Sequence, residues 1–284
     1  MIAKVVIIGS GLMGTGIAQV AGQAGYKVAI VDVAADILER SKQTINKQLT
    51  KLIEKGKLTS EEAESVRGRI AYTTEFKDAL AQADYLIEAV PEDLELKKKI
   101  LFEADSILKP SAIIASNTSQ LSITALAQAT SRGDRVIGTH WFYPPSVMRL
   151  VEIVVGNETS KATLDATVDF CRKAGKETVV CKDIYGFITS RAISAFVAEC
   201  LRIYEEGVAS IEDIDRAMTL GFNHPVGPFR LMDMSGIDTV FHSLEDLSKV
   251  YGERFTPTKT MVQNVRSGNL GQKTGKGFYE YSAH

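Results

Sequence analysis

Short apolar runs alternate with amphipathic stretches from residue 1 to residue 184 of the 284-residue chain. This alternation is typical of an α/β fold in which helices cover a doubly wound, mostly parallel sheet. The predicted strands are residues 4–8, 27–32, 69–72, 84–88, 112–115, 135–140, 150–155 and 177–181. The strand pattern stops after Ile184, and we place a domain boundary at 184–187.

The rest of the chain has helical spacing. Residues 187–208 carry apolar side chains one turn apart, and Gly and Pro positions separate the helices that follow. Those further helices are predicted at 211–220, 228–250 and 257–266. We therefore expect an all-helical C-terminal domain, residues 187–284, whose apolar content predicts packing against a second copy of the chain as a homodimer.

A long excursion separates the second and third predicted strands. Residues 35–66 are rich in Lys and Glu and are predicted to form two helices broken near Gly56, with Thr59 or Ser60 as an N-cap. A plain crossover needs one helix, so we expect this pair to project from the domain as an arm. Two interpretations stay open, a solvated surface hairpin or a basic arm that meets an anionic substrate.

A glycine-rich turn follows the first predicted strand, with the sequence Gly9-Ser10-Gly11-Leu12-Met13-Gly14. In a dinucleotide-binding turn, Gly9 permits the tight bend, Gly11 lets the backbone approach the pyrophosphate, and Gly14 lets the helix pack closely on the strand. The N–H groups at the start of that helix then face the phosphates. The alternative is a glycine-rich turn that binds no ligand.

Asp32 ends the second predicted strand, where a carboxylate can accept hydrogen bonds from the adenosine ribose. A 2′-phosphate beside this carboxylate would be repelled by about 4 kcal/mol per charge pair, at about 4 Å and an effective dielectric constant of about 20. No Arg occurs at residues 33–36 to offset the repulsion. The sequence therefore predicts NAD rather than NADP.

Composition and charge narrow the class of protein. A formal net charge of −2 gives no electrostatic reason to expect nucleic acid as a partner, and no apolar stretch is long enough to span a membrane. The first strand follows the N-terminus directly, so no signal peptide is expected. Cys171, Cys181 and Cys200 have neither metal-ligand spacing nor the pattern of a disulfide framework. We expect a cytoplasmic protein without a metal site.

Polar residues lie at the ends of several later strands. Asn117 and Ser119 follow the fifth predicted strand, and His140 closes the sixth. Ligands of open α/β sheets gather at the carboxyl ends of strands. Glu152 interrupts the apolar run of the seventh strand, which is costly without a partner. Each residue also has a plainer interpretation. His140 would be a packed histidine, Glu152 a member of a structural ion pair, and the segment with Asn117 and Ser119 an ordinary polar turn.

An ordered series of motifs resembles the L-3-hydroxyacyl-CoA dehydrogenase family, and within it the short bacterial 3-hydroxybutyryl-CoA dehydrogenases. The motifs are GSGLMGTGIAQ at 9–19, EAVPEDLELK at 88–97, SNTSQLSIT at 116–124, His140, VMRLVEIV at 147–154 and KTGKGFYEY at 273–281. The resemblance covers essentially the whole chain. It implies a Rossmann-type NAD-binding domain over residues 1–184, a helical dimerisation and substrate domain, and reversible oxidation of a 3-hydroxyacyl-CoA to a 3-ketoacyl-CoA.

The resemblance also implies roles for single residues. His140 matches the catalytic histidine, Glu152 its carboxylate partner, and Ser119 the serine that contacts the reacting oxygen and the cofactor. Imidazole, with an ordinary pKa of about 6.5, can take the C3 hydroxyl proton while hydride leaves for nicotinamide. Asn117 opens the turn that carries Ser119 and is a candidate for substrate binding. The positions implicated in contacts around NAD are Glu92, Lys97 and Lys273.

Among the substitutions that depart from the family pattern, three concern the active site or the domain junction. Tyr143 replaces an Asn near the nicotinamide, Ser190 replaces an active-site Asn, and Tyr185 replaces the proline of the domain junction. Ser190 has a shorter reach than Asn and fewer hydrogen-bonding groups. These changes bear on substrate range and rate more than on the type of reaction.

The resemblance gives the basic arm a use, since in the family this helix pair covers part of CoA. The CoA phosphates would suit Lys51, Lys55 or Lys57. Two other functions stay open. One is an NAD-dependent dehydrogenase of a free hydroxy acid, of the gulonate or carnitine type, and the other is a catalytically inactive NAD-binding protein of the crystallin kind.

Overall fold

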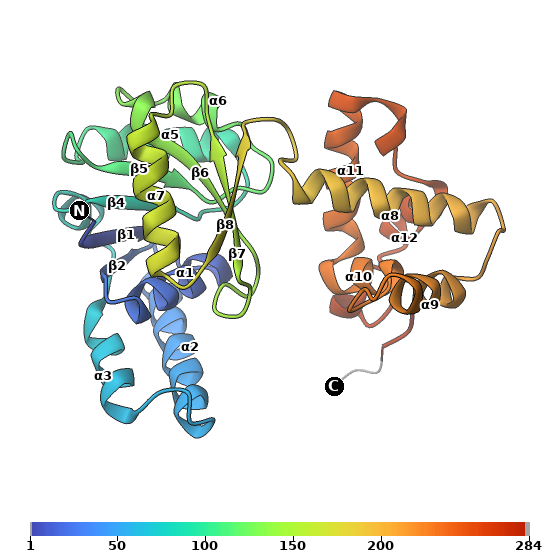
Figure 1. The fold of residues 1–284 in the computed structure, drawn as a ribbon, viewed down its shortest axis with the longest axis horizontal. Coiled ribbons are helices and arrows are strands. Elements are labelled where there is room, and N and C mark those ends of the chain that lie inside the picture. Colours follow the sequence, from blue (N-terminus) through green and yellow to red (C-terminus); the bar gives the residue numbers. More distant parts are fainter. Residues whose placement is uncertain (1, 282–284) are drawn as a thin grey trace. The chain divides into compact units, whose positions relative to one another are not determined.

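One sheet holds every strand found among residues 2–281, the part of the chain that the computed structural model describes (Figure 1). Its order is β3-β2-β1-β4-β5-β6-β7-β8, and each neighbouring pair is parallel except β6 and β7. The bounds are β1 (Lys4–Ile8), β2 (Lys27–Val31), β3 (Ile70–Thr73), β4 (Tyr85–Glu88), β5 (Ile113–Ser116), β6 (Val136–Trp141), β7 (Leu150–Val155) and β8 (Glu177–Lys182). The eight predicted strands and the doubly wound, mostly parallel sheet are confirmed.

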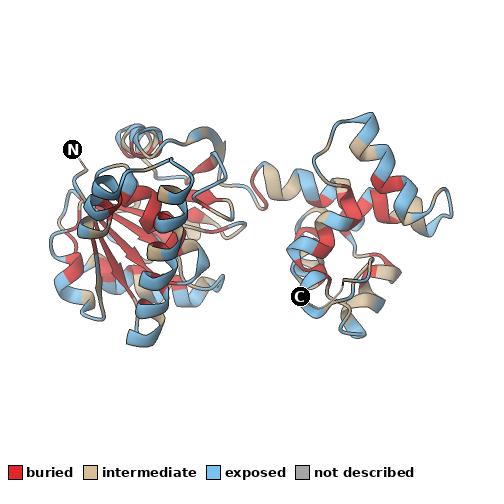
Figure 2. Cartoon of the chain, turned by 90° about the horizontal axis from the view of Figure 1, so that it is seen from below, coloured by how far each residue is buried: buried red, intermediate tan, exposed pale blue. Residues whose placement is uncertain are grey.

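Helices pack on the sheet because successive strand residues point to opposite faces. One buried cluster contains Ile7 of β1, Ile17 and Phe170, while Leu101 and Leu126 are buried outside that cluster. Figure 1 shows α1 and α7 in front of the sheet, and Figure 2 shows its strands as the buried centre of this domain. The helices are α1 (Leu12–Gln23), α2 (Ala35–Glu54), α3 (Ser60–Arg69), α4 (Phe76–Leu80), α5 (Leu94–Asp105), α6 (Ile123–Ala127) and α7 (Lys161–Lys173), with a short 3₁₀ turn at Gly133–Arg135.

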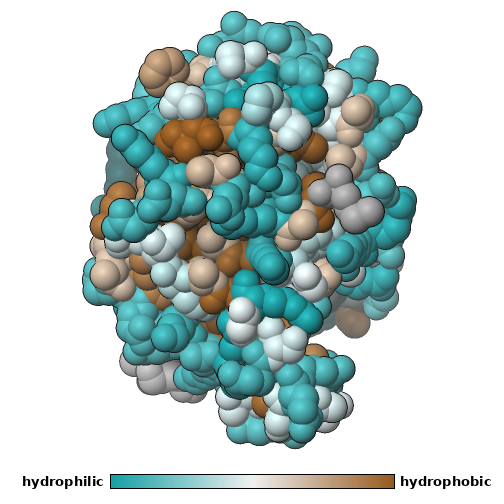
Figure 3. Space-filling view, turned by 90° about the vertical axis from the view of Figure 1, so that its left-hand side faces the viewer, coloured by the Kyte–Doolittle hydropathy of each residue, from teal (hydrophilic) through white to brown (hydrophobic). Residues whose placement is uncertain are grey.

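The predicted helical arm consists of α2 and α3. Thr59 is the N-cap of α3, since its hydroxyl accepts a hydrogen bond from Glu62 N at 3.1 Å and the Glu62 carboxylate accepts one from Thr59 N at 2.8 Å. Ile45 and Leu49 of α2 are buried and belong to the core cluster of the domain, so α2 packs against this core well along its length. The far end is a mostly hydrophilic lobe at the bottom of Figure 3.

The chain divides into two compact units between Ile184 and Tyr185. The second unit is helical, as expected, with α8 (Thr189–Glu205), α9 (Ile211–Gly221), α10 (Pro228–Ser235), α11 (Ile237–Tyr251), α12 (Lys259–Arg266) and short 3₁₀ turns at Glu253–Phe255 and Gln272–Thr274. Its core gathers Phe229, Met232 and Leu244. Across the described ranges of both units, no helix combines the length and apolar character that a membrane crossing requires.

The prediction of one continuous helix over 228–250 is wrong. Gly236 separates α10 from α11 with φ +90°, a left-handed conformation that glycine adopts readily. Instead of continuing a helical ladder, Ile237 N donates a hydrogen bond to Leu270 O at 3.2 Å. A tertiary contact with the C-terminal segment therefore replaces the helical hydrogen bond at this point.

Candidate active site

The glycine-rich turn joins β1 to α1 with the geometry that a dinucleotide site requires. Gly9 has φ +98°, and a Cβ there would lie 2.7 Å from Ala89 O. A Cβ on Gly14 would overlap the Gly9 carbonyl, so α1 approaches the turn more closely than another residue would allow. Gly11 is the N-cap of α1 and has open space where a side chain would stand. The helix N-terminus is thus open to an anionic group.

Asp32 follows β2 and is held against the same turn. Its Oδ2 accepts hydrogen bonds from Ser10 N at 2.7 Å and Ser10 Oγ at 2.8 Å, and its Oδ1 accepts one from Val33 N at 2.8 Å. These donors fix the carboxylate beside the start of α1. The residues present therefore fit NAD, with the phosphates at the helix N-terminus and the ribose at the carboxylate.

His140 and Glu152 face each other across the antiparallel pair β6 and β7. The register sets the two residues directly opposite, and His140 Nδ1 lies 2.6 Å from Glu152 Oε2. His140 is 7% exposed and Glu152 is fully buried. The His140 ring also packs against Phe142, with centroids 4.4 Å apart. A carboxylate in this position fixes the imidazole tautomer and stabilises the imidazolium form.

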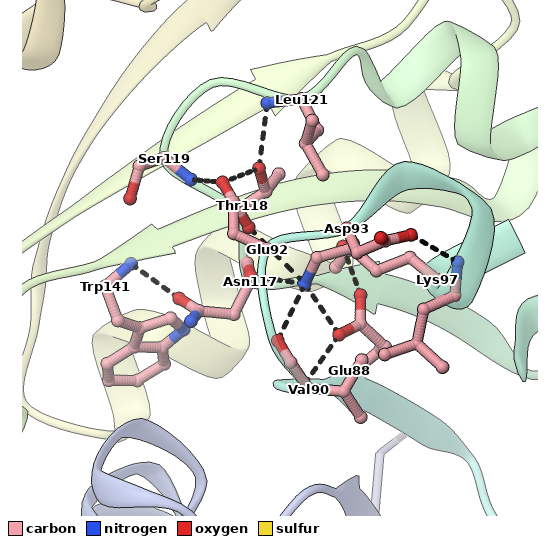
Figure 4. Close-up of polar contacts among 12 residues, drawn as sticks. Glu88, Val90, Glu92, Asp93, Lys97, Asn117, Thr118, Ser119, Leu121 and Trp141 are labelled. Carbon is pink, nitrogen blue, oxygen red and sulfur yellow. Dashed lines mark hydrogen bonds and ion pairs between the residues drawn. The ribbon is translucent and has the colours of Figure 1, made fainter. Parts of the chain in front are cut away.

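The turn after β5 is tied to its neighbours by side-chain bonds, drawn in Figure 4. Ser119 N and Thr118 Oγ1 donate to Glu92 Oε1 at 2.8 and 2.6 Å, and Asn117 Oδ1 accepts from Trp141 N at 3.2 Å. Ser119 and Asn117 are therefore brought to the strand ends that carry His140. These bonds fix the turn, which suits a Ser119 hydroxyl that must contact a substrate at one defined position.

Lys97 of α5 is fully buried, which the run of three lysines at 97–99 did not indicate. Its Nζ donates to Glu88 Oε1 at 2.7 Å, Asn117 O at 3.1 Å and Val90 O at 3.2 Å. Three acceptors match the three protons of an ammonium group. The expected contact between Lys97 and NAD stays a prediction. The same ammonium group already donates hydrogen bonds to three protein acceptors.

Glu88 opens the motif at 88–97, but no role could be assigned to it from the sequence. It ends β4, is fully buried, and accepts from Ser116 Oγ at 2.6 Å and Val90 N at 2.8 Å. Burial raises the pKa of Glu88 above its ordinary value, although the Lys97 charge and these hydrogen bonds oppose the rise. The signal in the sequence is a glutamate at the end of an apolar strand, three residues before Pro91.

A hollow of about 340 Å³ lies beside the glycine turn. Ser10 and Gly11 form one side, Ser41 and Gln48 of α2 another, and Tyr143 belongs to a third. Tyr143 is 61% exposed. The hollow therefore runs between the predicted cofactor turn and the base of the arm.

The remaining candidates lie in other places. Lys51, Lys55 and Lys57 are exposed toward the far end of the arm. Ser190, in the first turn of α8, and Lys273, paired with Asp238 at 2.6 Å, belong to the second unit, so their part in the site stays a prediction. Within residues 2–281 no cluster of three or more His, Cys, Asp or Glu side chains could hold a metal ion.

Comparison with known families gives two adjoining matches. The family profile described as 3-hydroxyacyl-CoA dehydrogenase, NAD binding domain, matches residues 4–184. The profile described as 3-hydroxyacyl-CoA dehydrogenase, C-terminal domain, matches residues 186–281. The two profiles together account for nearly all of the chain.

Individual relatives agree with these matches. The mitochondrial hydroxyacyl-coenzyme A dehydrogenase of Rattus norvegicus is 40% identical over 99% of this chain and 92% of the rat protein. A probable 3-hydroxybutyryl-CoA dehydrogenase of Deinococcus radiodurans is 41% identical over 97% of this chain and 99% of its own length. The solved structure of (S)-3-hydroxybutyryl-CoA dehydrogenase from Ralstonia eutropha is 41% identical, with a TM-score of 0.97 and full coverage of both chains.

Proposed function

Since the chain belongs to the 3-hydroxyacyl-CoA dehydrogenase family and is an NAD-dependent enzyme of that activity, we propose that it prefers short-chain thioesters. Its substrates would be 3-hydroxybutyryl-CoA in one direction and acetoacetyl-CoA in the other. The names of the Deinococcus and Ralstonia relatives support this choice of chain length. One observation supports His140 as the group that takes the substrate proton. His140 Nδ1 lies 2.6 Å from Glu152 Oε2.

The proposed chemistry assigns one task to each side chain. NAD, held at the glycine turn and Asp32, would supply the acceptor for the hydride from C3. The His140 imidazole takes the C3 hydroxyl proton at Nε2 while Glu152 holds Nδ1 and balances the charge that forms. The Ser119 hydroxyl holds the reacting oxygen, and the turn bonds of Ser119 N to Glu92 support its position. In the reverse direction His140 returns the proton to the oxygen.

The proposal extends to the CoA moiety. Lys51, Lys55 and Lys57 offer exposed positive charges on the arm, and the 340 Å³ hollow lies between the arm's base and the glycine turn. Ionic contacts with the CoA phosphates would weaken with added salt, because exposed charge pairs are screened. A homodimer through the second unit is part of the same proposal, supported by the exposed Leu220 and Phe222.

The test compares NADH oxidation with acetoacetyl-CoA and with free acetoacetate. We expect turnover with the thioester, and a triple Lys→Ala variant at 51, 55 and 57 should raise KM for the thioester about tenfold or more with unchanged affinity for NADH. A matched triple variant at the exposed lysines 77, 99 and 161 should leave both values unchanged. Equal turnover of the free acid, or no turnover of acetoacetyl-CoA, would contradict the proposed short-chain thioester substrate.

A further inference from the structure

The connection between β6 and β7, residues 142–149, supplies one wall of the 340 Å³ hollow. The residues that it contributes to the lining are Tyr143, Pro144, Pro145 and Ser146. Within the connection, Val147 N and Met148 N both donate to Pro144 O, at 2.9 and 3.0 Å. These bonds close a local turn, but they do not attach the turn to the rest of the domain.

Lys176 attaches this connection to the segment that joins α7 to β8. Its Nζ donates to Pro145 O at 2.5 Å and to Met148 O at 2.8 Å. Because the two acceptors are three residues apart, one ammonium group holds both parts of the turn. Hydrogen bonds from a charged donor are stronger than those between neutral groups.

The surroundings of Lys176 favour this arrangement. The side chain is half-buried, and its Nζ lies 5.9 Å from the ring centre of Trp141, the residue that ends β6. Burial lowers the pKa of Lys176 below its ordinary value. An ammonium group partly withdrawn from water requires acceptors, and the two carbonyls of the connection provide them.

The same connection packs against α1. A Cβ on Gly16 would lie 2.7 Å from Pro145 Cδ, so the proline ring occupies the space that a side chain on α1 would need. In Figure 1 the loop at the lower end of β7 lies beside α1. Pro145 is therefore held twice, with its ring against Gly16 and its carbonyl bonded to Lys176.

We infer that Lys176 is a positioning residue, which fixes the connection as a wall of the hollow and thereby sets the affinity for the acyl-CoA substrate. The inference rests on the proposed function for the identity of that substrate. Lys176 is not among the residues that line the hollow, so it acts through Pro145 and Met148. His140 and Glu152 should keep their register without it, because β6 and β7 pair through their own ladder.

The test uses Lys176→Met, which keeps most of the side-chain stem and removes the donor. Lys173→Met is the matched control, since Lys173 ends α7 and its Nζ lies 4.3 Å from the ring centre of Tyr26. We expect Lys176→Met to raise KM for acetoacetyl-CoA about tenfold over the control, because a hydrogen bond to a charged group shifts an equilibrium by about that factor. The kcat and the affinity for NADH should stay within about threefold of the control.

Hydrogen exchange of the ligand-free protein gives a second readout, which does not depend on activity. The bonds to Pro144 O protect the amides of Val147 and Met148. We expect the peptide that covers residues 142–149 to exchange about tenfold faster or more in Lys176→Met than in Lys173→Met.

Three results would overturn the inference. They are unchanged exchange of this peptide, a KM within about twofold of the control, and a fall in kcat at unchanged KM. If the unaltered enzyme does not turn over acetoacetyl-CoA, the proposed function fails separately. The exchange measurement then still decides whether Lys176 holds the connection.

Discussion

The contact between His140 and Glu152 gives the sharpest quantitative prediction. Glu152→Gln keeps the shape of the side chain and removes its charge from a fully buried site. With about 4 Å between the two delocalised charges and an effective dielectric constant of about 20, the carboxylate stabilises the imidazolium by about 4 kcal/mol. This corresponds to a decrease in kcat of about a thousandfold, since about 1.4 kcal/mol changes a rate tenfold.

The loss should also include an orientation effect. A Gln amide can present an N–H to Nδ1, which favours the wrong tautomer of His140. Loss of the corresponding carboxylate in a Ser-His-Asp site lowers kcat by about 10⁴. We therefore expect a decrease between 10²- and 10⁴-fold for Glu152→Gln, and the same range for His140→Asn as the general base is removed.

The assay follows the decrease of NADH absorbance with saturating acetoacetyl-CoA, beside an NADH titration. Glu177→Gln is the matched control, because Glu177 lies on the adjacent strand β8 and its pair with Arg149 is exposed on both sides. That control should keep normal kcat, and all variants should bind NADH normally. A kcat for Glu152→Gln within tenfold of the unaltered enzyme would refute the electrostatic reasoning.

Two further predictions concern selectivity and stability. Asp32→Ser should reduce the preference for NAD over NADP by about tenfold to a hundredfold, measured as the ratio of kcat/KM values, because the repelling carboxylate is removed; an unchanged ratio would contradict the role of Asp32. Asp105→Asn should lower the free energy of unfolding in urea by about 2 kcal/mol at pH 7, against about 0.5 kcal/mol or less for the exposed Asp169→Asn. Burial raises the pKa of Asp105, but hydrogen bonds from Ser131 and the Arg132 charge outweigh it and hold the pKa below the ordinary value. The stabilisation should thus be constant above about pH 4, where the unfolded carboxyl is ionised, and be lost as the pH falls through the lower folded pKa.

The strands of the sheet could be predicted from the sequence because buried parallel strands are short apolar runs between polar segments. The two helices of the arm could also be predicted, since the spacing of Thr59 and Glu62 is that of a capping box. The helix break at Gly236 could not be predicted, because a single glycine inside a helical pattern is often tolerated. The hydrogen bond from Ile237 N to Leu270 O replaces the helical one only in the folded protein.

Candidate site residues could be named from the sequence, but not all of their relations could. The apolar pattern alone does not give the direction of β7, but the short connection 142–149 leaves no room for a parallel crossover and indicates the antiparallel pair that sets Glu152 opposite His140. By contrast, Lys97, Lys98 and Lys99 are identical in type, and tertiary packing alone selects Lys97 for burial. The burial of single polar residues depends on the assembled fold.

The antiparallel hairpin of β6 and β7 carries two features on different segments, the proton-transfer pair and part of the wall of the hollow. The strands hold the proton-transfer pair in register, whereas the connecting segment, residues 142–149, contributes Tyr143 to the wall of the hollow. A substitution at Tyr143 changes the wall of that hollow and leaves the paired strands of His140 and Glu152 in register. The wall of the hollow and the register of the proton-transfer pair therefore depend on different segments of one hairpin.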